Sequence, residues 1–273
     1  MLTARAAVAA GTRRLEAAGC DTPRLDAELL VAEAIGADRS ALYTRSDQEI
    51  DGSAGRLLAE LLERREAREP VAYLLGRRAF RRLEIAVDRR VYIPRPETEL
   101  LVEIGLELPS GARVHEVATG SGAVALALLD ERPDLRVSAS DASLGAVTVA
   151  RQNAQRLGLE LDVVVAVGLP LEARGVDLVL ANLPYVREDE WTDLSPEISD
   201  HEPREALLAG SSGLDAIEAL VAGVPPGIRL ALEHGAGQGA GVRALLDGAE
   251  TRSDLAGLDR VTLGRAPAGS ASS

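Results

Sequence analysis

A short polar turn, Asn182-Leu183-Pro184-Tyr185, follows a run at Val176–Ala181 that is apolar except for Asp177. The run is short and rich in branched residues, so it predicts a buried parallel strand, and ligands of open α/β sheets bind beyond the carboxyl ends of such strands. Asn182 offers an amide oxygen and an NH2 group there, Pro184 stiffens the turn, and Tyr185 adds a flat wall. These residues suit a planar nitrogen group with two N–H donors, although four such residues alone are also typical of an ordinary strand exit.

A glycine-containing turn, Ala118-Thr119-Gly120-Ser121-Gly122, follows the predicted strand Val114–Val117 and precedes a predicted helix. Its two glycines allow a tight turn and the close approach of a ligand to the backbone, and the helix presents free N–H groups. Asp141 ends the next predicted strand, where a carboxylate can accept both hydroxyls of a ribose. Together these features predict a site for a nucleoside-containing cofactor. A dinucleotide-binding turn would have a third glycine where this chain has Ala125, so a dehydrogenase is the second interpretation.

Both turns require a sheet whose strands end on one edge. From Arg113 onwards strand-like and helix-like segments alternate, which predicts a parallel, doubly wound α/β sheet. We expect strands at 114–117, 135–139, 162–167, 177–180, 228–232 and 260–263, and helices at 123–129, 144–157, 214–221 and 241–246. Before this region, residues 1–69 are typical of a small helical bundle, and residues 71–91 look extended.

The composition limits the classes of function. The chain has 273 residues, of which 46% are hydrophobic, and a net charge of −13. Such an acidic chain is not expected to capture a nucleic-acid backbone broadly. Cys20 is the single cysteine and the three histidines have no metal-ligand spacing, so we expect neither an internal disulfide nor a metal. No apolar run approaches the ~18 residues of a membrane span, and we expect a cytoplasmic protein.

Several segments match the motifs of one enzyme family. They are Pro70–Gly76, Ile93–Glu99, Ala118–Gly122, Asp141, Val149–Ala154, Asn182–Tyr185, Glu202–Leu207, Gly213–Asp215 and Asp254–Val261. On these residues the chain resembles, over nearly its full length, the protein-(glutamine-N5) methyltransferases that modify peptide chain release factors. The combination of Pro-Arg-Pro-Glu-Thr with Asn-x-Pro-Tyr is the most specific part of the resemblance.

The resemblance implies S-adenosylmethionine as the cofactor and a release factor as the protein partner. The methyl group would go to the side-chain nitrogen (N5) of the glutamine in the Gly-Gly-Gln motif of that partner. The resemblance also implies a helical N-terminal domain that docks the release factor and a seven-stranded, Rossmann-like methyltransferase domain. We place these domains at residues 1–75 and 97–265, with a hairpin or linker at 76–96 and a disordered tail at 266–273. We expect a monomer that binds neither nucleic acid nor a membrane.

The chemistry is assigned to the two turns. We expect the Asn182 side-chain oxygen and the Leu183 backbone carbonyl to accept the two N–H bonds of the glutamine amide. Pro184 and Tyr185 would shape the catalytic pocket around that amide. The residues expected to bind the cofactor are Ala118, Thr119, Gly120, Ser121, Gly122, Asp141 and Asn182.

Four features depart from the family pattern. Glu116 stands where a shorter aspartate is usual, Ala118 and Leu183 replace a glycine and a proline, and the Gly168-Leu169 region lacks an acid that the family places near the adenine. These departures bear on cofactor affinity more than on the type of reaction. Ala118 and the missing acid at Gly168-Leu169 motivate one alternative, a degenerate member that binds without catalysis. The other alternative is a nucleic-acid methyltransferase acting on an exocyclic amine, because a similar turn solves the same geometric problem there.

We also predict where several polar residues within and near these motifs lie. We expect Arg95 and Glu97 to line the site rather than only to hold a loop. Glu202 is typical of a surface turn together with the histidine before it. His234, which follows Glu233 at a strand end, is expected in a solvated loop.

Overall fold

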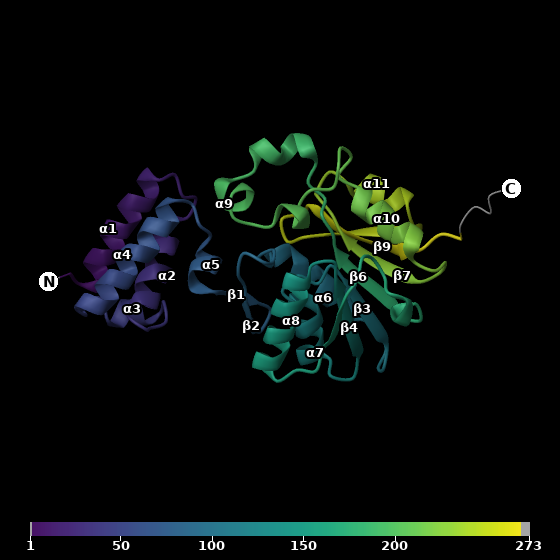
Figure 1. The fold of residues 1–273 in the computed structure, drawn as a ribbon, viewed down its shortest axis with the longest axis horizontal. Helices are drawn as coiled ribbons and strands as arrows, with labels where there is room; N and C mark the ends of the chain where they lie inside the picture. Colours follow the sequence, from purple (N-terminus) through teal and green to yellow (C-terminus); the bar gives the residue numbers. More distant parts are fainter. Residues whose placement is uncertain (1, 269–273) are drawn as a thin grey trace. The chain divides into compact units, whose positions relative to one another are not determined.

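The computed structural model describes residues 2–268, which divide into two compact units, and most of their helices and strands are labelled in Figure 1. The first unit holds the chain up to Arg77 together with Ser195–His201. The second unit holds Arg78–Leu194 and the chain from Glu202 onwards. Within the described residues, no helix is both long enough and apolar enough to cross a membrane.

The first unit is a small helical bundle. Its helices are α1 (Ala4–Ala17), α2 (Pro23–Ala34), α3 (Ala41–Thr44), α4 (Gly52–Glu66), α5 (Val71–Leu75) and α9 (Pro196–Ser199). Side-chain caps begin two of them: the Thr3 hydroxyl accepts a hydrogen bond from the Ala6 N–H at 3.3 Å. The Asp51 carboxylate accepts bonds from the N–H groups of Ser53 and Ala54, both at 2.8 Å. The core is built largely from leucines, including Leu15, Leu30, Leu58, Leu61 and Leu62.

A buried ion cluster holds α9 in this bundle. Arg65 on α4 is 4% exposed, and its guanidinium lies 2.8 Å from a carboxylate oxygen of Asp26 and 2.8 Å from one of Glu197. Arg68 donates two further hydrogen bonds to Glu197, both at 2.6 Å. A buried charge that loses its partner is costly, so this cluster keeps Ser195–His201 in the first unit although its neighbours in sequence belong to the second.

Residues 71–91 differ from the extended segment that we expected. Val71–Leu75 forms helix α5, which ends at Gly76 with a φ of 68°. The strands β1 (Arg77–Phe80) and β2 (Leu83–Ala86) then form a two-stranded sheet. The five residues of α5 are too few to show a helical repeat in the sequence. The sequence signal for this helix is Gly76, the left-handed cap at its end, which the prediction of an extended segment did not use.

Seven strands form the sheet of the second unit. In chain order they are β3 (Arg113–Val117), β4 (Arg136–Asp141), β5 (Asp162–Val165), β6 (Leu178–Asn182), β7 (Arg229–Glu233), β8 (Asp247–Ser253) and β9 (Asp259–Arg265). Their spatial order is β5-β4-β3-β6-β7-β9-β8, and every neighbouring pair from β5 to β7 is parallel. This arrangement confirms the predicted seven-stranded α/β fold.

The sheet is not parallel throughout, which corrects our expectation. β9 pairs in antiparallel fashion with both β7 and β8, and β8 was absent from the predicted strands. Its residues are largely exposed and polar and lie at the edge of the sheet, so they have no apolar alternation to reveal a strand. Ala266, predicted to open a disordered tail, is buried and donates its N–H to the Ile228 carbonyl at 2.9 Å. Residues 269–273 of that predicted tail lie outside the described residues.

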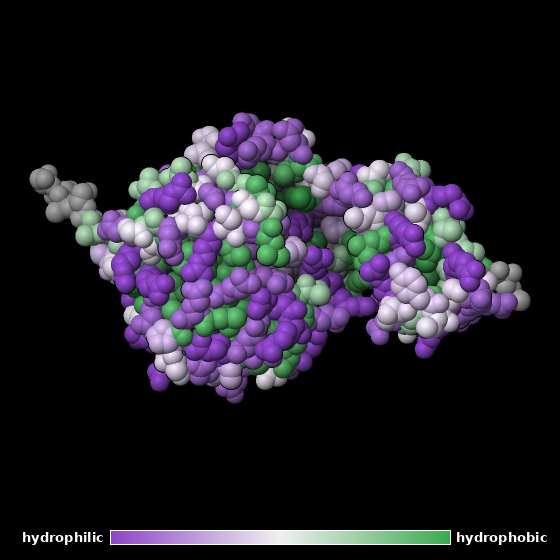
Figure 2. All heavy atoms as spheres, turned by 180° about the vertical axis from the view of Figure 1, so that it is seen from behind, coloured by the Kyte–Doolittle hydropathy of each residue, from purple (hydrophilic) through white to green (hydrophobic). Residues whose placement is uncertain are grey.

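Helices cover both faces of this sheet (Figure 1). Those on one face are α6 (Glu99–Leu106), α7 (Ala123–Glu131) and α8 (Leu144–Leu157), and those on the other are α10 (Asp215–Gly223) and α11 (Gly239–Ala244). Ile217 of α10 and Val242 of α11 share one core cluster with Val179 and Leu230 of the strands. The central strands are therefore buried on both sides, which explains their continuous apolar sequences. Hydrophilic side chains cover much of the face seen in Figure 2, and hydrophobic ones appear there in small groups.

Candidate active site

A cleft of about 780 Å³ opens beyond the carboxyl ends of β3, β4 and β6. The predicted site residues that line it are Ala118, Thr119, Gly120, Ser121, Asp141, Asn182, Leu183, Pro184 and Tyr185. Gly122 does not line it: this residue begins α7 with a φ of 82°, and a Cβ there would approach the Cβ of Ala150 on α8 to 3.2 Å. Gly122 is therefore needed for close helix packing and a left-handed backbone. The structure brings the two predicted turns into a single cleft.

The glycine turn and Asp141 form the first half of this cleft. Gly120 has a φ of 56° and open space where a Cβ would lie, so its backbone is accessible to a ligand. The Asp141 carboxylate accepts hydrogen bonds from the N–H of Gly120 at 2.9 Å and of Ser143 at 2.8 Å. Burial raises the pKa of Asp141, and these two bonds oppose that shift. Each carboxylate oxygen can accept more than one hydrogen bond, so capacity remains for a pair of hydroxyls.

Ala118 occupies a backbone conformation that glycine would adopt with less strain. Its φ is 57°, in the left-handed region, where an L residue costs roughly 1–2 kcal/mol because Cβ crowds the following carbonyl. This is the physical reason why a glycine is usual at this position. The residue nevertheless lines the cleft, so the strained alanine is part of the candidate site.

Glu116, another departure from the family pattern, connects the strand to the helix after the turn. The side chain is 3% exposed. One carboxylate oxygen accepts a hydrogen bond from the Thr119 hydroxyl at 2.6 Å and from the Ala125 N–H at 3.0 Å. Burial raises the pKa of Glu116 to about 8, against the lowering effect of both bonds. Glu116 thus connects the end of β3 to the first turn of α7.

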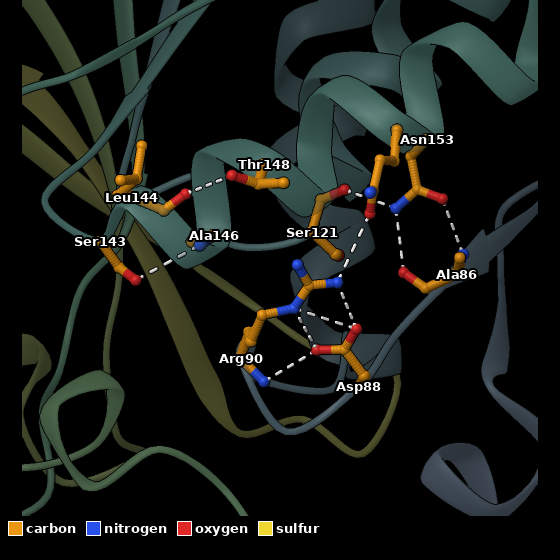
Figure 3. Close-up of polar contacts among 10 residues, drawn as sticks. Ala86, Asp88, Arg90, Ser121, Ser143, Leu144, Ala146, Thr148 and Asn153 are labelled. Carbon is orange, nitrogen blue, oxygen red and sulfur yellow. Dashed lines mark hydrogen bonds and ion pairs between the residues drawn. The ribbon is translucent and has the colours of Figure 1, made fainter.

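Asn153 supports the glycine turn from behind, a role that the sequence did not reveal. Figure 3 shows its side chain on α8 pointing between the backbone of Ser121 and that of Ala86. Its Nδ2 donates to the carbonyl oxygens of both residues at 2.9 Å, and its Oδ1 accepts from the Ala86 N–H at 2.8 Å. Asn153 is fully buried. It therefore connects the glycine turn to strand β2, which lies far away in sequence.

Asn182 is oriented by residues from two other elements. Its Nδ2 donates to the Thr98 hydroxyl oxygen at 3.2 Å, and Thr98 ends the short 3-10 helix η1 (Pro96–Thr98). The Thr98 hydroxyl in turn donates to a carboxylate oxygen of Glu233 at 3.2 Å. Glu233 ends β7 directly opposite Asn182 in the register of the two strands. With its NH2 group bonded to Thr98, Asn182 keeps its side-chain oxygen for a ligand.

Arg95 and Glu202 hold a loop together, which corrects two expectations: Arg95 does not line the cleft, and Glu202 is not exposed in a surface turn. The Arg95 guanidinium contacts the Glu202 carboxylate and lies 4.6 Å from the centre of the Tyr92 ring. The second oxygen of Glu202 accepts the Ile93 N–H at 3.1 Å. Glu202 is only 6% exposed. A buried carboxylate of this kind is tolerated because each of its oxygens has a hydrogen-bond partner. Among the described residues, the neighbours Tyr92 and Pro94 line the cleft and Arg95 does not.

His234 is buried, which contradicts the expected solvated loop. Its ring nitrogens lie 2.8 Å from the Thr262 hydroxyl and 2.9 Å from the Gly235 carbonyl. Burial lowers the pKa of this histidine, so it is held in its neutral form. Its partner Thr262 lies on β9, the strand that runs antiparallel to β7. The spacing of residues along the sequence did not indicate that Thr262 lies next to His234.

Part of the cleft lining is apolar. The loop Ala166–Leu169 contributes to it together with Ala216, Ala219 and Leu220 of α10, and Arg174 lines the cleft as well. No acid faces a ligand from Gly168-Leu169, as the sequence indicated. A flat base fits an apolar lining of this kind, and the diol of a ribose fits the free acceptor capacity of Asp141. The residues present therefore fit S-adenosylmethionine.

Comparisons with known proteins agree with this geometry. Residues 6–76 match the family described as the PrmC N-terminal domain, and residues 96–199 match the methyltransferase small domain. A release factor glutamine methyltransferase of Xylella fastidiosa is 42% identical, over 96% of this chain and 98% of its own. Those of Burkholderia pseudomallei and Rhodospirillum rubrum are 41% and 38% identical, over 98% and 93% of this chain and 100% and 82% of their own. On this similarity along nearly its whole length, the chain belongs to the release factor glutamine methyltransferase family.

Proposed function

We propose that this chain transfers the methyl group of S-adenosylmethionine to the side-chain nitrogen of the glutamine in the Gly-Gly-Gln motif of a peptide chain release factor. Its family membership supports the reaction, since relatives about 40% identical over most of the chain are named for it. The single observation that carries the site is the convergence of Asn182 and Asp141 on one cleft. A carboxamide can be held at one end of this cleft while a nucleoside is held at the other.

The Asn-Leu-Pro-Tyr turn is the proposed grip on the glutamine. An amide nitrogen is a poor nucleophile because its lone pair is delocalised into the carbonyl. The Asn182 side-chain oxygen and the Leu183 backbone carbonyl accept its two N–H bonds, which aims the nitrogen along one line and favours electron density on it. Tyr185 packs against the amide plane, and Pro184 keeps the turn stiff.

The glycine turn and Asp141 are the proposed cofactor site. When bound, S-adenosylmethionine supplies a methyl group on a positively charged sulfur. The carboxylate of Asp141 would hold the ribose hydroxyls, while Ala118–Ser121 and Asn182 would hold the methyl-bearing end beside the turn that binds the glutamine. The methyl group would replace one hydrogen on the amide nitrogen held by Asn182 and Leu183, and that hydrogen would leave to solvent as a proton.

The helical residues 1–75 are the proposed docking domain for the release factor, and we propose a cytoplasmic monomer. The rival activity on nucleic acid is disfavoured by the net charge of −13, because a nucleic-acid enzyme needs a basic surface for the phosphate backbone. The second rival, binding without catalysis, rests on the strained Ala118 and on the missing acid near Gly168.

One labelling experiment separates these possibilities. The protein is incubated with isotopically labelled S-adenosylmethionine and a release factor, and the modified residue is located by mass spectrometry. We expect one methyl group on the glutamine of Gly-Gly-Gln, and none on a release factor in which that glutamine is alanine. Asn182→Ala should reduce turnover at least ~100-fold through lost positioning, with cofactor affinity within about threefold by calorimetry. Label on tRNA or duplex DNA, or tight cofactor binding without any transfer, would contradict the proposal.

A further inference from the structure

We propose that Thr98 and Glu233 are positioning residues that set which way round the Asn182 carboxamide lies, so that its oxygen and not its NH2 group faces the glutamine. The inference rests on the proposed function, since it concerns the side chain proposed to hold the substrate amide. Neither Thr98 nor Glu233 needs to touch the reacting atoms for this role. They act on the reaction through Asn182.

The three side chains form one directed chain of hydrogen bonds. The Asn182 Nδ2 lies 3.2 Å from the Thr98 hydroxyl oxygen, and that oxygen lies 3.2 Å from Oε1 of Glu233. Thr98 is 5% exposed and Glu233 is 2% exposed, so water is a poor substitute for either bond. The adjacent ends of β6 and β7 hold Asn182 and Glu233 side by side, and Thr98 enters between them from η1.

The direction of this chain follows from the single proton of a hydroxyl group. An ionised Glu233 can only accept, so Thr98 must give its proton to it. The Thr98 oxygen then has only lone pairs for Asn182, and only the NH2 side of the carboxamide can bond to them. A carboxamide turned the other way would set two oxygens against each other and would present hydrogens to the hydrogens of the glutamine. Glu233 thereby decides the orientation of a side chain that it does not contact directly.

Protonation of Glu233 would remove this constraint. Its second oxygen, Oε2, has no hydrogen-bond partner among the described residues. Burial raises the pKa of Glu233 to about 7, while the bond from Thr98 lowers it. The charged and titratable groups that act on Glu233 are Glu97, which raises its pKa, Arg260 and Arg95, which lower it, and the tyrosines Tyr92 and Tyr185. A protonated carboxyl can donate to Thr98, whose own proton is then free for the Asn182 oxygen, so both orientations become available.

Four variants and one control test this relay in the full-length protein. Thr98→Val keeps the shape of the side chain and removes the hydroxyl, and Thr98→Ser restores the hydroxyl. Glu233→Gln removes the titration and keeps an acceptor, and Asn182→Ala removes the grip itself. Thr148→Val is the matched control, because among the described residues the Thr148 hydroxyl bonds only within α8, to the Leu144 carbonyl at 2.7 Å. For each variant, kcat and the KM for the release factor are measured from pH 5.5 to 9, with the cofactor Kd from calorimetry.

The wild-type kcat should rise with pH through an inflection near 7, because the ionised Glu233 is the orienting form. Thr98→Val should lower kcat roughly 10–100-fold at pH 8, as expected for one misdirected hydrogen bond in the positioning of the nucleophile. Its cofactor Kd should stay within about threefold, and its inflection near pH 7 should vanish. Thr98→Ser should recover most of the rate, Glu233→Gln should flatten the profile, and Thr148→Val should behave as wild type.

The outcomes that overturn the inference differ from those that overturn the proposed function. If Asn182→Ala is inactive while Thr98→Val keeps the wild-type kcat and pH profile, the relay is wrong and the grip by Asn182 stands. If Thr98→Val fails to fold, Thr98→Ser and Glu233→Gln still decide, since an unchanged inflection in Glu233→Gln contradicts the relay. If Asn182→Ala itself turns over at the wild-type rate, the proposed grip falls and the relay with it.

Discussion

The carboxylate of Asp141 and the backbone N–H of Gly120 are joined by a hydrogen bond of 2.9 Å, which links the end of β4 to the turn after β3. The bond fixes the direction in which this carboxylate of the proposed cofactor site points. The Asp141 carboxylate, which is proposed to accept the ribose hydroxyls, is thus aligned by the backbone of the glycine turn. Pre-alignment of this kind reduces the entropy that binding must overcome.

Asp141→Ala should therefore weaken cofactor binding. Two hydrogen bonds to a charged acceptor would be lost, so we expect the Kd for S-adenosylmethionine to rise roughly 30–1,000-fold. Calorimetry on the purified variant measures this. The matched control is Asp189→Ala, because Asp189 is exposed and bonds to Arg187 outside the cleft. Equal affinities for wild type and Asp141→Ala would remove this residue from the site.

Ala118→Gly should stabilise the fold. The φ of 57° costs alanine roughly 1–2 kcal/mol, and the greater freedom of glycine in the unfolded chain offsets part of the gain. We expect the free energy of unfolding to rise by about 0.5–1 kcal/mol in urea denaturation. Ala127→Gly, inside the regular helix α7, should instead lower it by about 1 kcal/mol. A destabilised Ala118→Gly would show that the alanine methyl group makes a contact worth more than the strain.

Asn153→Ala should loosen the support of the glycine turn. The substitution leaves the Ala86 N–H and the carbonyls of Ala86 and Ser121 without their side-chain partner, so we expect a loss of about 2–4 kcal/mol in the free energy of unfolding. Gln152→Ala, at the exposed neighbouring position, should change it by less than about 0.5 kcal/mol. Similar losses in the two variants would mean that helix α8, and not this clamp, is what the substitution disturbs.

Glu116→Gln should change the pH dependence of stability. The pKa of Glu116 is about 8 in the folded chain against 4.5 when exposed, so the folded state holds a proton that the unfolded state releases. Stability from this group is complete below about pH 4.5 and is lost as the pH rises to about 8. The variant does not titrate, so it should become more stable than the wild type by up to roughly 1.4 kcal/mol per pH unit across that window. Urea denaturation of the cofactor-free proteins at pH 5, 6.5 and 8 measures the difference. A difference that stays constant with pH would place the Glu116 carboxyl in a polar environment.

Residues that act through local backbone chemistry could be predicted, and residues that act through partners distant in sequence could not. The glycine turn and the Asn182–Tyr185 turn follow apolar strands, and any parallel sheet brings such ends to one edge. The predicted position of Arg95 was wrong because its ion-pair partner Glu202 is distant in sequence, on a loop between β6 and α10. The strand β8 escaped prediction because an exposed edge strand needs no apolar alternation.

The sequence by itself determined the class of fold, the two turns and the kind of group each could bind, because these depend on residue types and short spacings. Only the tertiary structure decided that Thr98 and Glu233 stand behind Asn182, that Asn153 supports the turn at Ser121, and that Glu116 faces inward. The physical reason is that a buried polar side chain must find a partner. Which partner it finds is set by the packing of strands and helices that no local pattern records.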